Sequence, residues 1–146
     1  LKNFSKEDFA RLHPGGILGN KLHLTVDQVC DSLNKPMVFL NDNLQKVIVE
    51  ISSKRLGATA VLDNNNIVGI ITDGDLRRML ENKENFKTKY AKDLMSRSPK
   101  TVEKKCLAHD ALSIMKKYSI TQLLVTSNKQ YVGIIHLHDI LKNNFF

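Results

Sequence analysis

The sequence predicts a mixed α/β (α+β) fold built from two copies of one unit. Three observations support this prediction. The run VGII at residues 68–71 recurs at 132–135, which is 64 positions further along the chain. Apolar residues at helical spacing precede both runs in matching places, and short apolar strands lie between them. A copy of about 60 residues buries too little surface to be stable alone, so the two copies are expected to pack together.

Composition limits the classes of protein to consider. The chain has 146 residues, of which 42% are hydrophobic and 25% charged, as in a globular domain. No apolar run approaches the roughly 18 residues of a membrane helix, and the first residues do not resemble a signal peptide. The net charge is +7, but the lysines are scattered and no aromatics alternate with them, so neither nucleic acid nor membrane is an expected partner.

The two cysteines favour a reducing compartment. Cys30 and Cys106 lie far apart, follow no metal-ligand spacing and stand among apolar neighbours. They are therefore interpreted as free thiols, and the expected location is the cytoplasm. Since the chain begins with Leu1, it is interpreted as a fragment or an excised domain.

The first 25 residues have no counterpart in the repeat. Ser5 and Asp8 form a capping box that predicts a short helix over 6–12. His13-Pro14 ends this helix, and the glycines at 15, 16 and 19 leave the following backbone permissive.

The first copy is predicted over residues 26–82. A short helix is expected near Val29-Cys30, which pairs with Leu94-Met95 of the second copy. Asp42-Asn43 are good N-cap residues for a helix over 44–55. A strand at Ala60-Val61, a hairpin turn at 64–66 and a second strand follow, and they lead into a helix over 73–80.

The second copy is predicted over residues 90–146, after a connector at 83–89 that lacks an apolar pattern. Ala111, Leu112 and Met115 match the helix face formed by Val47, Ile48 and Ile51. The strand at 124–125 and the turn at 127–129 then repeat the order of the first copy.

A turn of the pattern G-h-h-T-x-x-D, where h is hydrophobic, closes the last strand of the first copy at residues 69–75. Thr72 and Asp75 form a capping box, and the start of the following helix suits an anion. In the second copy His136 replaces Thr72, His138 replaces Gly74, and Asp139 remains. His136 and His138 could form a metal pair, but no third ligand is evident, so no metal is expected.

Two such turns at one register, inside matching elements, resemble a pair of CBS domains, also called a Bateman module. The resemblance covers roughly residues 26–143. It implies tandem β-α-β-β-α repeats related by a pseudo-two-fold axis. It also implies a regulatory ligand, namely an adenine or cytidine nucleotide or CMP-Kdo, while no cofactor is required. The implied ligand-binding residues are Thr72, Asp75, Arg77, His136 and Asp139, with Arg78 as a further candidate beside Arg77.

The segment DFARLHPGGILGNKL, followed by TDGDLRR, is similar to arabinose 5-phosphate isomerases of the KpsF/GutQ type. In these enzymes a sugar-isomerase (SIS) domain precedes two CBS domains, so residues 1–25 correspond to its end and to the linker. The family interconverts D-ribulose 5-phosphate and D-arabinose 5-phosphate on the way to Kdo for lipopolysaccharide or capsule. His13 is the implied catalytic residue, in the intact enzyme only; the alternative is that it anchors the turn.

The resemblance implies that this chain alone is not an enzyme, because the SIS domain would precede Leu1. Two functions remain open. The first is a regulatory module that senses a nucleotide or nucleotide-sugar. The second is a purely structural dimerisation module without a ligand. The implied assembly is a homodimer of the CBS pair and a tetramer of the parent.

Overall fold

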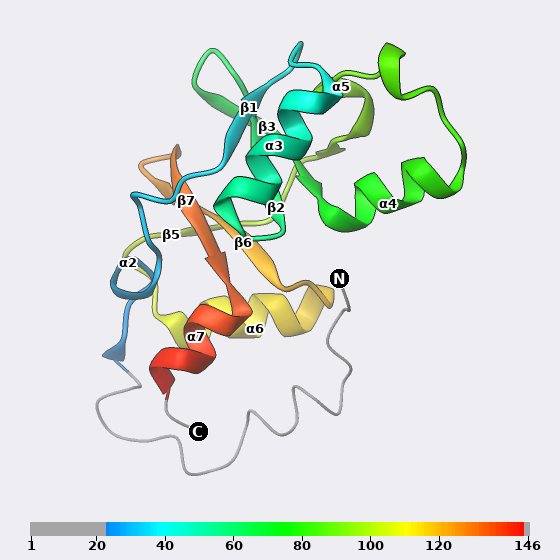
Figure 1. Ribbon diagram of the computed structural model, residues 1–146. Coiled ribbons are helices and arrows are strands. Elements are labelled where there is room, and N and C mark those ends of the chain that lie inside the picture. The colour runs from blue at the N-terminus through cyan, green and yellow to red at the C-terminus, as the bar shows by residue number, and fades with distance from the viewer. Residues whose placement is uncertain (1–22, 145–146) are drawn as a thin grey trace. The chain divides into compact units, whose positions relative to one another are not determined.

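The computed structural model describes residues 23–144 in two compact units (Figure 1). The first unit is Asn34–Lys100, and the second consists of residues 23–33 and 101–144. Both units combine a small sheet with helices, so the predicted α+β fold of two repeats is confirmed. No helix within 23–144 is long and apolar enough to cross a membrane.

The first unit holds a four-stranded sheet in the order β1-β2-β3-β4. The strand β1 runs parallel to β2, and the other neighbours are antiparallel. The elements in chain order are β1 (Met37–Phe39), α3 (Leu44–Lys54), β2 (Ala58–Asp63), β3 (Asn66–Thr72), α4 (Asp73–Glu81), the 3₁₀ helix η2 (Phe86–Thr88), α5 (Ala91–Leu94) and β4 (Ser96–Arg97).

The second unit holds a three-stranded sheet in the order β5-β6-β7. The strands β5 and β6 are parallel, and β6 and β7 form an antiparallel hairpin. The elements in chain order are α2 (Val26–Val29), β5 (Thr101–Glu103), α6 (Ala108–Tyr118), β6 (Gln122–Ser127), β7 (Gln130–His136) and α7 (Leu137–Asn144).

Each unit has its own apolar core beneath its long helix. The predicted face of α3 buries Val47 and Ile51 against the sheet, with Ile48 at the edge of the cluster. The matching face of α6 buries Ala111, Leu112 and Met115. The helix α3 begins where its cap predicts, because the Asn43 side chain accepts a hydrogen bond from Lys46 N at 2.9 Å.

Both hairpin turns lie where the sequence predicts them. Asn64 and Asn65 have φ of 50° and 70°, and Asn128 and Lys129 have φ of 51° and 69°. Two successive positive φ angles are the signature of the type I′ turn, whose twist matches that of the flanking strands. Asparagine tolerates this conformation better than most residues, which explains its repeated use here.

The short helices pack in a way that the repeat does not predict. Although α5 follows the connector, Ala91 N donates to Asp42 O at 2.9 Å, so α5 lies within the first unit. Likewise α2 precedes the first copy, but Val26 N donates to Cys106 O at 2.8 Å within the second unit. Each compact unit thus takes its short helix from the other sequence repeat. The domain limits 26–82 and 90–146 describe sequence repeats and stay a prediction.

Candidate functional site

In the first unit the predicted capping box is present at the junction of β3 and α4. Thr72 N donates to Asp75 Oδ2 at 2.8 Å, and Asp75 N donates to Thr72 Oγ1 at 3.3 Å. Thr72 Oγ1 also lies 3.1 Å from Asp75 Oδ2. These bonds satisfy donors at the start of α4 and fix the Asp75 carboxylate at the helix entrance.

Arg78 completes this cluster. Its Nη2 lies 2.5 Å from Asp75 Oδ1, while its side chain stays 64% exposed against 14% for Asp75. Gly74 lies beneath the guanidinium, since a Cβ added there would be 3.3 Å from Arg78 Nη1. The arrangement places a fixed carboxylate beside an accessible guanidinium, and a guanidinium can bind a phosphate through two parallel hydrogen bonds.

The Arg77 side chain pairs with a different carboxylate, that of Glu81. Its Nε lies 3.7 Å from Glu81 Oε1, and both side chains are more than half exposed. The structure therefore brings Thr72 and Asp75 together with Arg78, not with Arg77. Side chains one residue apart on a helix diverge by about 100°, so only the arginine three residues after Asp75 can reach its carboxylate.

The second unit builds its helix start from histidine. His136 N donates to Asp139 Oδ2 at 3.2 Å, as Thr72 does to Asp75. His138 N donates to His136 Nδ1 at 3.0 Å. The imidazole therefore caps α7 in the place of the threonine hydroxyl, although it bonds the backbone one residue earlier.

The capping imidazole is held neutral. The His136 side chain is buried, and its ring stacks on that of His138 with centroids 4.8 Å apart. Burial lowers the pKa of His136, with a smaller contribution from His138, while Asp139 acts in the opposite direction. Because Nδ1 accepts a hydrogen bond, the neutral ring carries its proton on Nε2. Within residues 23–144 no group of three His, Cys, Asp or Glu side chains could hold a metal ion.

Of the other predicted residues, His13 lies outside the described part of the chain. Thr72 and Asp75 meet in the first unit, and His136 and Asp139 meet in the second. Arg78 is the better-placed arginine, and its spacing from Asp75 is the signal that selects it.

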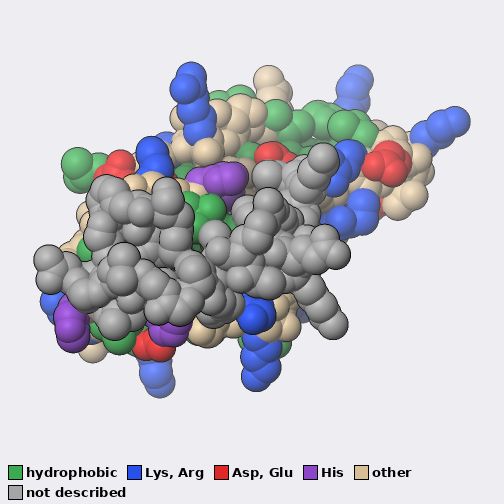
Figure 2. Space-filling view, turned by 90° about the horizontal axis from the view of Figure 1, so that it is seen from below, with side chains coloured by type: hydrophobic (Ala, Val, Ile, Leu, Met, Phe, Trp, Pro, Cys, Tyr) green, Lys and Arg blue, Asp and Glu red, His purple; other side chains and the backbone are tan. Residues whose placement is uncertain are grey.

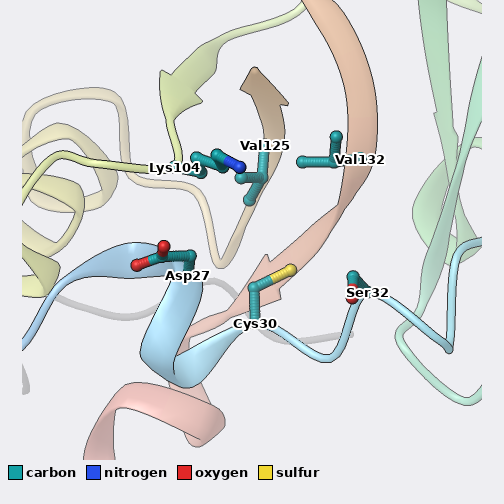
Figure 3. A pocket seen from close by; sticks show the side chains of 6 residues that line it. All are labelled: Asp27, Cys30, Ser32, Lys104, Val125 and Val132. Atoms are coloured by element: carbon teal, nitrogen blue, oxygen red, sulfur yellow. The ribbon is translucent and has the colours of Figure 1, made fainter.

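A pocket that the sequence does not predict lies in the second unit (Figure 3). Its volume is about 250 Å³, and it opens between α2 and the strands β6 and β7. The lining residues are Asp27, Cys30, Ser32, Lys104, Val125 and Val132. Burial, reinforced by nearby carboxylates, raises the pKa of Cys30 to about 11, so the lining thiol is protonated at neutral pH.

The chain thus contains two capped helix starts, each following a sheet that is built on a β-hairpin. A known domain family has this combination. The family model for the CBS domain matches residues 26–82 and 91–144, so the chain belongs to the CBS domain family and contains two copies of that domain.

Several of the similar proteins are arabinose 5-phosphate isomerases. The arabinose 5-phosphate isomerase KdsD of Francisella tularensis is 46% identical over 144 residues, which are 97% of this chain. The same match covers 44% of the isomerase, so the chain spans less than half the length of that relative.

Solved structures share the fold. An uncharacterized conserved protein from Pyrococcus horikoshii superimposes with a TM-score of 0.75 at 20% identity, over 86% of this chain and 95% of that one. A CBS domain protein from Pyrobaculum aerophilum, solved in complex with AMP, gives a TM-score of 0.69 at 20% identity, over 82% and 97%. At such identities the likeness shows the fold alone.

Proposed function

We propose that this CBS pair is the regulatory part of a D-arabinose 5-phosphate isomerase of Kdo biosynthesis and that it binds a nucleotide or nucleotide-sugar. The observation that carries the ligand proposal is the cluster of Thr72, Asp75 and Arg78 at the start of α4. The proposal of the parent activity is supported by the 46% identity to KdsD.

Each group of the cluster has a separate role in this proposal. The Asp75 carboxylate accepts hydrogen bonds from ribose hydroxyls, for which it exchanges part of its contact with Arg78. The Thr72 hydroxyl and the start of α4 lie near the phosphate, where the helix dipole favours negative charge. Arg78 then pairs with the phosphate, and Arg77 remains the alternative arginine that the sequence predicted. His136 and Asp139 are the corresponding groups of the second unit.

A nucleotide is favoured as the ligand because a CBS protein of the same fold is solved with AMP bound. In this proposal the nucleotide is a regulatory ligand, and the module requires no cofactor. Its binding shifts the parent enzyme between states only by its difference in affinity for them.

The test is a thermal-shift series with AMP, ADP, ATP, CMP, CMP-Kdo and arabinose 5-phosphate at about 1 mM. A ligand present at 100 times its Kd adds about 2.7 kcal/mol to the free energy of unfolding. We expect one nucleotide to raise the melting temperature, and Asp75→Asn to remove this increase.

Arg77→Gln and Arg78→Gln form a matched pair for the same assay, since both remove one exposed guanidinium from α4. We expect Arg78→Gln to abolish most of the ligand-induced shift and Arg77→Gln to retain it. The reverse result would assign the phosphate to Arg77. No shift with any compound, for a folded protein, would contradict the ligand proposal.

His13 remains the proposed catalytic residue of the full-length protein, where it would act as an acid or base in the aldose–ketose isomerisation. Its test is therefore made in the full-length enzyme. We expect His13→Asn to lower kcat by 10²-fold or more while the CBS ligand still binds. An unchanged kcat would assign His13 to anchoring the turn. The isolated pair is expected to show no isomerase activity.

The second candidate function is a structural module that only holds subunits together. It is favoured by apolar side chains exposed on the first unit, among them Val49 at 58% and Leu80 at 61%. Light scattering is expected to report a homodimer of the pair and a tetramer of the parent. A stable dimer without any ligand-dependent shift would support this function instead of the first.

Nucleic acid and membranes are not proposed as partners, and the proposed location is the cytoplasm. The Lys and Arg residues are scattered along the chain, and Figure 2 shows such side chains at several separate places on the face that it draws. A basic stripe would be expected for a phosphate backbone.

A further inference from the structure

Several residues that line the pocket in the second unit differ from their counterparts in the first, and two of these differences shape it. In the first unit Met95 covers Gly69, since a Cβ added to that glycine would lie 2.6 Å from the Met95 sulfur. In the second unit Cys30 covers Gly133 in the same manner, with its sulfur 2.9 Å from such a Cβ. Cysteine has two side-chain heavy atoms fewer than methionine, so the space that Met95 fills in one unit is left open in the other.

The second difference, at Lys104, adds a positive charge. In the first unit Lys92 N donates to Leu40 O, and in the second Asp27 N donates to Lys104 O, so Leu40 and Lys104 occupy matching positions. Leu40 packs against the apolar core of its unit. Lys104 instead brings an ammonium group to the wall of the pocket, which Val125 and Val132 also line (Figure 3).

The neighbouring carboxylates are engaged by other groups. Asp27 accepts from Thr25 Oγ1 and pairs with Lys105 Nζ at 3.3 Å. Glu103 accepts from Thr126 Oγ1 and from Asn128 N. Among the described residues no salt bridge joins the Lys104 ammonium to a carboxylate, although its charge acts on Glu103. The pocket combines an apolar wall, a protonated thiol, the Asp27 carboxylate and the positive charge of Lys104.

We propose that this pocket binds a small organic anion, a carboxylate or phosphate monoester, whose charged group pairs with Lys104 and whose short apolar body packs against Val125 and Val132. A volume of about 250 Å³ lies just below the ~300–1,000 Å³ of typical ligand pockets. A pocket of this size has room for a ligand of a few heavy atoms but is too small for a nucleotide. The site lies in a different unit from Thr72 and Asp75 and does not depend on the function proposed above.

The experiment is a ¹H–¹⁵N NMR titration of the whole chain with isovalerate and with isobutyl phosphate, which separate the carboxylate and phosphate forms of the ligand. The uncharged isoamyl alcohol is the control probe. We expect saturable shifts of the Lys104 and Gly133 amides with at least one anion and none with the alcohol.

The variants assign the binding to the pocket. Cys30→Met introduces the methionine found at Met95 in the first unit and is expected to abolish the chemical-shift changes. If Cys30→Met does not fold, Cys30→Leu fills the same space and is used in its place. Lys104→Ala is expected to weaken binding about 10-fold or more, because a charge-assisted hydrogen bond is lost. Lys116→Ala, on the exposed side of α6, removes the same charge elsewhere and should leave the affinity unchanged.

Three results would overturn the proposal. These are shifts that do not saturate, equal binding of isoamyl alcohol, and an affinity that Cys30→Met or Lys104→Ala leaves unchanged. An effect of Lys116→Ala equal to that of Lys104→Ala would likewise assign the shifts to general charge attraction.

Discussion

At the scale of single residues, the two helix starts solve one problem with different chemistry. Both α4 and α7 need acceptors for the backbone donors of their first turn. Thr72 supplies a hydroxyl that does not titrate, whereas His136 supplies an imidazole nitrogen that can accept only while it is unprotonated. The cap of the second unit therefore depends on the protonation state of His136, and the threonine of the first unit has no such dependence.

The stability of the second unit should fall on acidification through the titration of His136. Its pKa is lowered in the folded state, so the unfolded chain binds the proton more tightly. The contribution is thus complete above the reference value of 6.5 and is lost as the pH falls through the lower folded value. We expect the melting temperature to decrease between pH 7 and pH 5.

His136→Thr restores the cap of the first unit and removes the titrating group, so it should flatten this decrease. His23→Thr, at a position without such a cap, is the control and should leave the decrease unchanged. Equal pH profiles for the wild type and His136→Thr would show that another group dominates.

At the scale of elements, each short helix is fixed on its sheet by a glycine in the last strand. Gly69 of β3 lies under Met95, and Gly133 of β7 lies under Cys30 with a φ of 159°. A side chain at either position would hold the segment after the short helix away from the sheet. The repeated glycine is therefore required by close approach, in addition to its place in the turn motif.

Gly69→Ala should destabilise the protein by about 1–3 kcal/mol, because the new Cβ overlaps Met95 and forces the packed segment to shift. Gly74→Ala is the matched control: its Cβ meets the flexible end of Arg78 at 3.3 Å, and alanine favours a helix. Urea denaturation measures the free energy of unfolding of both variants. A loss for Gly74→Ala as large as that for Gly69→Ala would contradict the packing argument. The double variant Gly69→Ala/Met95→Ala should recover part of the loss.

At the scale of the whole molecule, the compact units are not the sequence repeats. The first unit takes α5 from the start of the second repeat, and the second unit takes α2 from the start of the first. In both cases the donors at the start of the short helix bond to carbonyls of the loop that precedes the long helix. The exchange covers part of a core that each repeat by itself would leave exposed.

A fragment of residues 34–100 should consequently be more stable than one of residues 26–89, although their lengths are similar. The first keeps α5 and Met95 on its own sheet, whereas the second loses both and retains α2 without its partner. Circular dichroism should show a higher melting temperature for 34–100. A higher melting temperature for 26–89 would mean that the repeat, rather than the exchanged unit, is the folding unit.

The sequence by itself determined the repeat, the faces of α3 and α6, the positions of the two hairpin turns and the capping box of Thr72 and Asp75. All of these depend on residues close together in the chain, where spacing and backbone preference act directly. The tertiary structure decided the rest: the exchange of α2 and α5, the choice of Arg78 beside Asp75, the neutral imidazole of His136 and the pocket beside Cys30. These features depend on distant segments that share one core, and no local pattern records which short helix will cover which sheet.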